Sequence, residues 1–425
     1  MWSRAFGEAD VDGARPATTE TLYRIGSISK LFTATAVLQL RDAGALRLDD
    51  PVTRHVPWFV IPRDASHGPG AVTVRHLLTH TAGLPRESAF AYWSDFTFPG
   101  TGELRDALAR QAAILPVDIQ WKYSNLAFAI AGAVVASASG LAYGDYIRTR
   151  LLAPLGMTRT LVEAPAEDTR DLARGYGRRL PGRRRKRRPI CDMQALASAG
   201  NMTSSVHDLA KFAMLQFRLE GAGDDAVVRG STLREMHRVQ WLDPTWQAGW
   251  GLGFRVSREG GYTCVGHGGL VPGHAAHLRL IPEHKVAIIA LTNADDTMPH
   301  EYTHRAMHLL VPAVARAANA ATPVAVIDPA WARYAGRYRG DWGDVHVLLT
   351  DRGLEVIAPL AEDPMHGRIT LTPVAEHTFR MTGNDPYDAP GELLTFEVAT
   401  DGRVVTARFA MEPIFPVATW DRARP

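Results

Sequence analysis

The sequence predicts an α+β protein, in which an antiparallel sheet is flanked by helices, followed by a small all-β, barrel-like domain. Apolar residues recur at helical spacing in several segments of residues 28–219, and short β-rich runs follow over residues 250–291. Beyond residue 331 the chain contains mainly short strands separated by turn signals. Segregation of helices and antiparallel strands is typical of α+β folds. A length of 425 residues fits two or three domains.

Periodicity identifies the helices of the first domain. Ile28, Leu31, Phe32 and Leu38 share one helical face, which predicts a helix that ends near Gly44. Further helices are expected over residues 74–81, 104–113, 124–139, 209–219 and 301–318. Strands are expected over residues 2–11, 250–256, 262–266, 274–280 and 285–291, and a turn at residues 282–284 makes the last two strands a hairpin. Together these elements form a domain of residues 1–318.

The second domain follows an Ala/Pro-rich linker over residues 319–330. Strands are expected over residues 345–349, 354–358, 368–371, 378–382, 393–399 and 404–409. Turn signals at residues 351–353 and 401–402 separate them. Short strands at this regular spacing predict a sandwich or barrel over residues 331–425.

Composition excludes several classes of protein. Hydrophobic residues make up 46% and charged residues 22% of the chain, which argues against a mainly disordered protein. A net charge of +2 gives no global attraction to nucleic acid or to an anionic membrane. No apolar run is long enough for a membrane helix. Cys191 and Cys264 are too few for a disulfide framework or a thiolate zinc site.

Lysine is scarce, because only five of the 47 basic residues are lysine and the rest are arginine. One of the five is Lys30, which lies three residues after Ser27 at the start of the first predicted helix. This spacing puts both side chains on one helical face, where an amine could accept the serine proton if its pKa is lowered. A guanidinium could not do so. By itself the pair reads more readily as a helix cap and a surface lysine.

Two further segments carry polar groups suited to the same chemistry. Tyr123 and Asn125 precede the apolar helix over residues 124–139, and they present a phenol and an amide. His267 is followed by Gly268 and Gly269 at the end of a β run, where glycines let a substrate approach a strand edge. Taken singly, the first pair reads as the cap of a buried helix and the second as a glycine-rich turn.

Together and in this order, the three segments resemble the serine β-lactamase and penicillin-binding protein superfamily. The resemblance is closest to its class C-like branch, which includes D,D-peptidases, D-aminopeptidases and carboxylesterases. It spans residues 2 to about 318, and the motifs are jointly specific. Supporting stretches are residues 24–27, 46–51, 76–84 and 154–157.

The resemblance implies a role for each residue of the three segments. Ser27 would be the acylated nucleophile, and Lys30 and Tyr123 would share the general base and acid work, with the division between them open. Asn125 would orient Lys30 and the substrate. The N–H groups of Ser27 and Leu270 would form the oxyanion hole. No metal and no cofactor are implied.

One departure bears on the substrate. Many relatives carry Lys where this sequence has His267, and a solvent-accessible His is mostly neutral at pH 7. Efficient β-lactamase activity is therefore disfavoured. We expect a serine hydrolase that acts on a small ester, amide or short peptide, of the carboxylesterase, D-amino-acid peptidase or weak β-lactamase type. The alternative is a catalytically silent member that binds a peptide or a protein partner.

A second departure concerns the front of the chain. Relatives usually carry about one helix and one or two strands before the segment that matches Trp2. This predicts that the chain is truncated at its N-terminus or that its start codon is misassigned. The chain as written lacks a signal core and would be cytoplasmic, whereas a missing signal segment would place the protein in the cell envelope or outside the cell. The sequence leaves the oligomeric state open.

Three rival features remain. Residues 300–304 match H-E-x-x-H, the helical zinc motif with His300 and His304 as ligands, but no third ligand is in sight. The basic run over residues 183–188 is expected to be a solvated loop tip near the site mouth, which could favour anionic substrates. The C-terminal domain resembles the lipocalin-like domains appended to this family, and it would serve packing, oligomerisation or narrowing of the site mouth.

Overall fold

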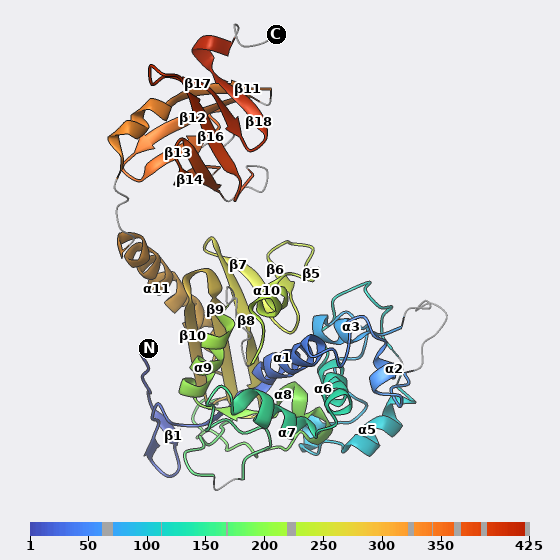
Figure 1. Cartoon of the computed structure of the whole chain (residues 1–425). Helices are drawn as coiled ribbons and strands as arrows, with labels where there is room; N and C mark the ends of the chain where they lie inside the picture. The colour runs from blue at the N-terminus through green and yellow to red at the C-terminus, as the bar shows by residue number, and fades with distance from the viewer. Residues whose placement is uncertain are drawn as a thin grey trace. The chain divides into compact units, whose positions relative to one another are not determined.

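The computed structural model describes residues 1–61, 71–111, 113–166, 169–218, 227–321, 327–341, 343–360, 367–383 and 389–420. The chain divides into two compact units, Met1–Ala315 and Arg316–Pro425 (Figure 1). Each unit has its own hydrophobic core.

The first unit is built on a six-stranded antiparallel sheet, as the sequence predicts. Its order is β10 (Val286–Thr292), β9 (His274–Ile281), β8 (Tyr262–Val271), β7 (Arg255–Glu259), β6 (Ala248–Trp250) and β5 (Trp241–Leu242). The single strand expected over residues 250–256 is two strands, because a turn closed by the Gly251 N–H to Phe254 carbonyl bond separates them. Gly253 takes φ +84° in this turn, a conformation that favours glycine.

Strand β8 corrects another expectation. It runs on to Val271, so His267, Gly268 and Gly269 lie within a strand and not in a glycine-rich turn. Gly268 pairs with His277 of β9 across the antiparallel ladder. The three residues are therefore held by the regular hydrogen bonding of the sheet.

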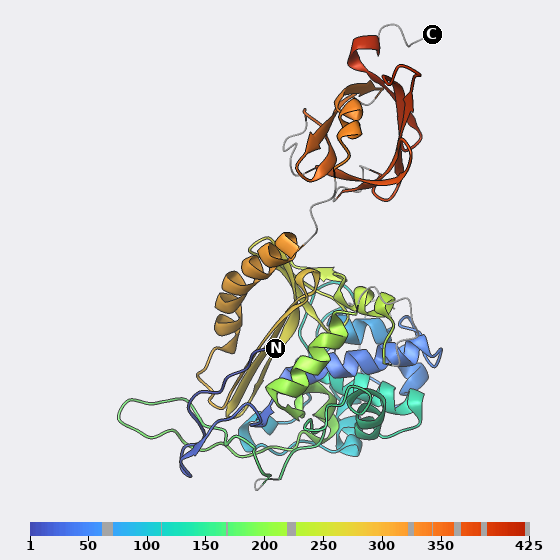
Figure 2. The same ribbon diagram turned by 60° about the vertical axis from the view of Figure 1, so that its left-hand side comes forward.

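Helices cover both faces of the sheet. Figure 2 shows α11 (Pro299–Ala321) along one face, where Met307 and Val311 pack with Cys264 and Ile281. The other face carries the helix-rich part of the unit. Its helices are α1 (Ser29–Asp42), α2 (Val52–His55), α3 (Val74–Thr79), α4 (Tyr92–Asp95), α5 (Thr101–Leu108), α6 (Asn125–Ser139), α7 (Tyr143–Ile147), α8 (Ala197–Gly200), α9 (Val206–Gln216) and α10 (Gly230–His237).

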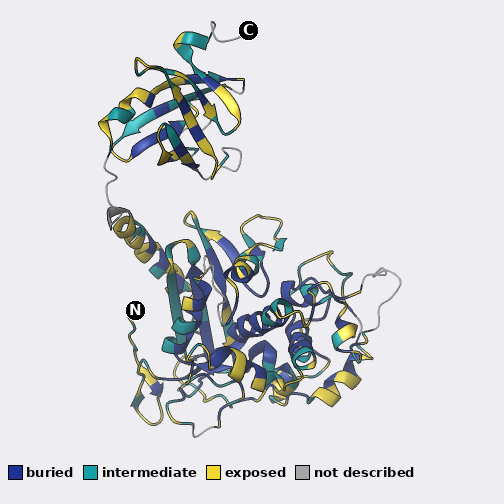
Figure 3. Ribbon diagram, in the orientation of Figure 1, coloured by how far each residue is buried: buried dark blue, intermediate teal, exposed yellow. Residues whose placement is uncertain are grey.

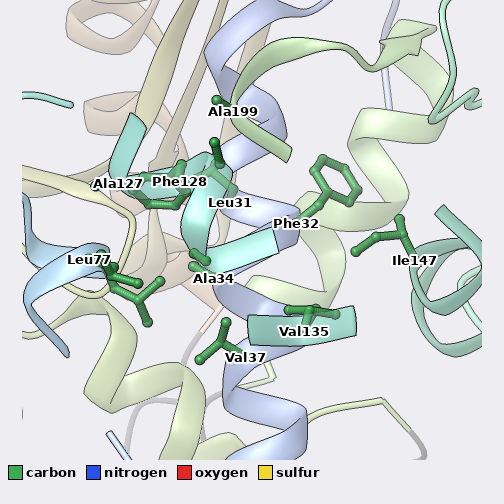
Figure 4. Packing of buried hydrophobic residues seen from close by; sticks show 14 of the residues in the cluster. Leu31, Phe32, Ala34, Val37, Leu77, Ala127, Phe128, Val135, Ile147 and Ala199 are labelled. Carbon is green, nitrogen blue, oxygen red and sulfur yellow. The ribbon is translucent and has the colours of Figure 1, made fainter. Parts of the chain in front are cut away.

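Helix α1 is the centre of the core. Every residue from Ser29 to Leu38 is buried, including Lys30. Figure 3 shows the helices packed against the sheet largely in the colour of buried residues. Leu31 and Phe32 pack among apolar residues of α6 and its neighbours (Figure 4), and the Phe32 ring stacks on Phe212 of α9 at 4.2 Å between centroids. The N-terminal end of this helix therefore has a fixed position.

The ends of the first unit differ from expectation. The strand predicted over residues 2–11 forms only over Glu8–Asp10 (β1), which pairs with Arg15–Pro16 (β2). Residues 1–7 pair with no described strand, so the β-type pattern there lacks the ladder partner that a strand requires. At the other end α11 extends to Ala321, and residues 319–321 of the expected linker are helical. Residues 322–326 lie outside the described residues.

The second unit is a closed antiparallel barrel. Its strands are β11 (Gly336–Gly340), β12 (Gly343–Thr350), β13 (Gly353–Ile357), β14 (Ile369–Ala375), β15 (Thr378–Thr382), β16 (Leu393–Val398), β17 (Val404–Phe409) and β18 (Glu412–Pro416). The barrel-like fold is as predicted, but β11 and β18, which close it, were not expected. Strand β18 was not predicted because it contains Pro413 and Pro416, and proline is unusual in strands. Tyr334 and Phe396 stack inside the barrel at 4.6 Å.

Among the described residues, no single helix has the length and apolar composition of a membrane span. The bent pair Asn125–Ser139 and Tyr143–Leu152 meets those two criteria only when the two helices are taken together. Residues of Asn125–Ser139 belong to the buried core of the first unit.

The packing of α1 yields a stability prediction. Replacing Phe32 by Ala should lower the free energy of unfolding by about 3–5 kcal/mol, because the ring is fully buried and leaves a cavity. Urea unfolding followed by circular dichroism at 222 nm reports the helices. The control Met214→Ala, at an exposed position of α9, should stay within about 0.5 kcal/mol of the wild type. An equally small change for Phe32→Ala would contradict the packing described.

Candidate active site

Ser27 and Lys30 meet at the start of the central helix. Ser27 lies on the 3₁₀ turn η1 (Gly26–Ile28), and Lys30 lies in the first turn of α1. The Lys30 Nζ is 3.0 Å from Ser27 Oγ, 2.8 Å from Asn125 Oδ1 and 2.6 Å from the Ala199 carbonyl oxygen. Lys30 is fully buried, so its reading as a surface lysine beside a helix cap is wrong.

The environment of Lys30 disfavours its charged form. Burial holds the pKa of the Lys30 amine well below its usual value; the Glu87 carboxylate acts in the opposite direction, and the Arg86 guanidinium adds to the lowering. In the neutral amine two hydrogens and one lone pair face three neighbours. Asn125 Oδ1 and the Ala199 carbonyl can only accept hydrogens. The lone pair is therefore left for the Ser27 hydroxyl.

Tyr123 contacts the same serine. Its hydroxyl donates to Ser27 Oγ at 2.8 Å. Burial raises the pKa of the Tyr123 phenol, and the hydrogen bond with Ser27 lowers it by less. The phenol consequently keeps its proton at neutral pH. Ser124 follows as the N-cap of α6, where its hydroxyl accepts the Ala127 N–H, so the cap that the sequence suggests is present beside the polar motif.

His267 lies on β8 facing Tyr123, with 6.1 Å between the ring centroids. It is buried, which corrects the expectation of a solvent-accessible side chain. Burial lowers the pKa of His267 to about 3, and the nearby Lys30 contributes. Its Nδ1 donates to the Gly268 carbonyl at 2.5 Å, and its Nε2 has no hydrogen-bond partner among the described residues. The imidazole is therefore neutral at pH 7.

Glycines let strand β8 touch the turn that carries Ser27. An ideal Cβ on Gly26 would lie 2.7 Å from the Leu270 nitrogen, and one on Gly269 would lie 1.9 Å from the Ile25 carbonyl oxygen. Neither position can carry a side chain without moving the backbone. This contact brings the Leu270 nitrogen to the turn of Ser27, the arrangement that the expected oxyanion hole needs.

These residues surround one cleft of about 1090 Å³ in the first unit. Every predicted site residue except Lys30 lines this cleft. Lys30 is fully buried, and its Nζ contacts Ser27 Oγ. The lining residues include Ser27, Tyr123, Asn125, His267, Gly268, Gly269 and Leu270, together with Arg86, Glu87, Trp121 and Arg255.

Sequence reasoning missed two kinds of site residue. Arg86, Glu87 and Arg255 are charged residues outside the three motifs, and nothing in their spacing distinguishes them from surface charges. His80 lies outside the three motifs and contacts the second of them. Its ring lies 4.5 Å from the Tyr123 ring, and its Nδ1 accepts the Ser124 N–H at 3.1 Å. Burial, then Lys30, holds the pKa of His80 well below its usual value.

The two histidines of the H-E-x-x-H match over residues 300–304 have separate contacts. His304 bonds Glu259 at 2.8 Å, whereas His300 lines the cleft and its ring lies 6.4 Å from that of His277. Within the described part of the chain, no group of three His, Cys, Asp or Glu side chains could hold a metal ion. Cys191 and Cys264 are buried free thiols.

Two arginines of the basic run over residues 183–188 form ion pairs, unlike the solvated side chains expected at a loop tip. Arg185 forms an ion pair with Asp296, and Arg188 forms one with Asp295 at 2.8 Å. Arg188 and Asp295 also line the cleft. At these two positions the arginine charges are offset by carboxylates.

The glycine contact yields a prediction with a control beside it. Gly269→Ala should lower kcat/KM for an activated ester by about a hundredfold or more, because the methyl group forces β8 away from Ser27 and disturbs an oxyanion donor. Gly268→Ala should be tolerated, since its ideal Cβ meets its nearest neighbour, His277 Cδ2, at 3.5 Å. Equal kinetics for the two variants would contradict the close approach of β8 to η1.

Comparison with known proteins identifies the family of this chain. The profile of the beta-lactamase family matches residues 1–311. Penicillin-binding protein 4 of Amycolatopsis lactamdurans is 32% identical over 292 residues, covering 65% of this chain and 73% of that protein. Esterase EstB of Burkholderia gladioli is 36% identical over 177 residues, covering 37% of this chain and 42% of the esterase.

A solved structure extends the likeness over both units. The octameric penicillin-binding protein homologue from Pyrococcus abyssi has a TM-score of 0.63 and 24% identity, covering 97% of this chain and 92% of that chain. The fold is thus the α+β fold of the β-lactamase and penicillin-binding protein group. The resemblance expected from the three motifs is confirmed, and the chain belongs to the beta-lactamase family.

Proposed function

We propose that this protein hydrolyses esters or amides through an acyl-enzyme formed on Ser27. The observation that carries the proposal is the position of Ser27 Oγ, which lies 3.0 Å from the Lys30 amine and 2.8 Å from the Tyr123 hydroxyl in the wall of a cleft. A serine becomes nucleophilic when a neighbour takes its proton. A buried lysine whose pKa lies well below its usual value is suited to that role.

The reaction runs in two halves. Lys30 accepts the Ser27 proton while Oγ attacks the substrate carbonyl carbon, and the carbonyl oxygen becomes an oxyanion facing the N–H groups of Ser27 and Leu270. The tetrahedral intermediate collapses as the bond to the leaving group breaks, and Tyr123 donates its proton to that group, regaining one from Lys30. Water then attacks the acyl-enzyme with the same groups as base and acid, releasing the carboxylic acid and restoring Ser27.

The division of labour between lysine and tyrosine follows from their surroundings. Burial favours the neutral form of both residues. A neutral amine is a base, whereas a neutral phenol is a proton donor. Lys30 therefore activates Ser27, and Tyr123 relays the proton to the leaving group.

The charges around the cleft bear on the substrate. His267 is neutral and supplies no cation for an anionic substrate group. Arg255, which is paired with Gly266 across β7 and β8, is exposed in the same cleft and forms no ion pair with any described residue. Arg86 is instead paired with Glu87 at 3.4 Å. We therefore favour acyl donors that carry an anionic group within reach of Arg255.

The covalent step is tested with an acylation mimic. A fluorescent fluorophosphonate should label the wild-type protein on Ser27, because the activated Oγ displaces fluoride at phosphorus. Ser27→Ala should not be labelled, and Ser231→Ala, at an exposed position of α10, should be labelled like the wild type. An unlabelled wild type, or equal labelling of Ser27→Ala, would refute the proposed nucleophile.

The substrate preference is tested with a pair of esters. Arg255→Gln should reduce kcat/KM for mono-p-nitrophenyl glutarate by about tenfold, since a charge-assisted contact is lost. It should leave p-nitrophenyl acetate nearly unchanged. Arg258→Gln, which removes a second exposed charge from β7, is the control. A similar effect of Arg255→Gln on both esters would exclude Arg255 as the anion-binding group.

A further inference from the structure

We propose that Glu87 is a positioning residue of this active site: by fixing the orientation of the Asn125 amide, it directs the lone pair of the Lys30 amine at the Ser27 hydroxyl. The inference rests on the proposed function, because it explains how Lys30 is prepared to accept a proton. Glu87 belongs to none of the three motifs, and it lies in the segment between α3 and α4.

Glu87 is held by several contacts. Its Oε1 accepts the Asn125 Nδ2–H at 2.7 Å, and its Oε2 accepts the hydroxyl of the buried Tyr92 at 2.6 Å. The Glu87 carbonyl accepts the Gln111 Nε2–H at 2.9 Å. The neighbouring Arg86 carbonyl accepts the backbone N–H of Asn125 at 2.8 Å. Carboxylate and amide are thus locked together by main-chain and side-chain bonds.

The carboxylate selects one of two amide orientations. An asparagine amide has an accepting oxygen at one end and a donating nitrogen at the other, whereas an ionised carboxylate can only accept. Nδ2 must therefore face Glu87, and Oδ1 must face Lys30 Nζ, as observed at 2.8 Å. The reversed amide would set Oδ1 against Glu87 Oε1 and replace a hydrogen bond by the repulsion of two acceptor oxygens, which is costly in a partly buried site.

The amide orientation in turn fixes the amine. With Asn125 Oδ1 and the Ala199 carbonyl taking the two hydrogens of neutral Lys30, the remaining lone pair meets Ser27 Oγ at 3.0 Å. If the amide were reversed, Nδ2 would compete for that lone pair and the serine would lose its base. The chain of contacts therefore runs from Tyr92 through Glu87 and Asn125 to Lys30.

The charge of Glu87 adds a second effect. Burial lowers the pKa of Lys30, and Glu87 is the charge that opposes this lowering, while Arg86 reinforces it. Without the carboxylate, the pKa of Lys30 should fall further. If neutral Lys30 is the base, the rising limb of the pH–rate profile would then move to lower pH.

Two variants separate orientation from charge. Glu87→Gln keeps an oxygen that can accept from Asn125 and removes the charge. Glu87→Ala removes both. Glu235→Gln, which alters a carboxylate bonded to Arg41 away from the cleft, is the control, and circular dichroism checks that each variant folds.

The direct readout is the titration of Lys30 by NMR with ¹³C-labelled lysine. Only five lysines give signals, and Lys30 is identified by replacing Lys122, Lys186, Lys211 and Lys285 with Arg one at a time. The Lys30 midpoint should move to lower pH in Glu87→Gln and stay unchanged in Glu235→Gln. A purely structural role of Glu87 would not move it.

Kinetics supply the second readout. Fluorophosphonate labelling of Ser27 should slow by about tenfold or more in Glu87→Ala at each pH. In Glu87→Gln, the rising limb of the profile of labelling rate against pH should move to lower pH. An unchanged Lys30 midpoint in Glu87→Gln, or wild-type labelling rates in folded Glu87→Ala, would overturn the inference. Failure of the proposed function would look different: the wild type itself would remain unlabelled, while the NMR titration would still report whether Glu87 acts on Lys30.

Discussion

The burial of one amine is the constraint on which the rest of the site depends. Lys30 lies in a helix whose neighbouring residues are all buried, and among the described residues its Nζ forms no ion pair with a carboxylate. A charged ammonium in such a place is costly unless it is paired. The cost is reduced when the amine is neutral. Beside Ser27, such a neutral amine is the base that the proposed mechanism requires.

The surrounding architecture holds the partners of that amine in place. Helix α6 begins at Asn125, helix α8 supplies the Ala199 carbonyl, and turn η1 supplies Ser27, so three segments distant in sequence meet at Lys30. On the opposite side, Gly26 and Gly269 let β8 lie against η1. The same core packing that stabilises the unit therefore sets the distances between Lys30 and the groups with which it would exchange a proton in the proposed mechanism.

Much of this could be predicted from sequence, for physical reasons that differ by element. The helix from Ser29 has strong apolar periodicity, and the Ser27–Lys30 spacing follows from helical geometry. The closing barrel strand β18 could not be predicted because its prolines are atypical of strands, although it pairs with β11 and β17 in the barrel. The burial of His267 could not be read from its sequence, since it depends on rings such as Trp250 from another strand. The proposed role of Glu87 could not be predicted from the sequence. A single loop carboxylate looks like any surface charge until its contacts with Asn125 and Tyr92 are known.

The most direct test of the account is to trap the acyl-enzyme with a slowly hydrolysed p-nitrophenyl ester. Acid quenching within the first turnovers, followed by mass spectrometry of peptides, measures where the acyl group resides. The account predicts a burst of p-nitrophenol and the mass of the acyl group on the peptide that contains Ser27. Turnover of the ester with no acyl mass on that peptide would contradict it.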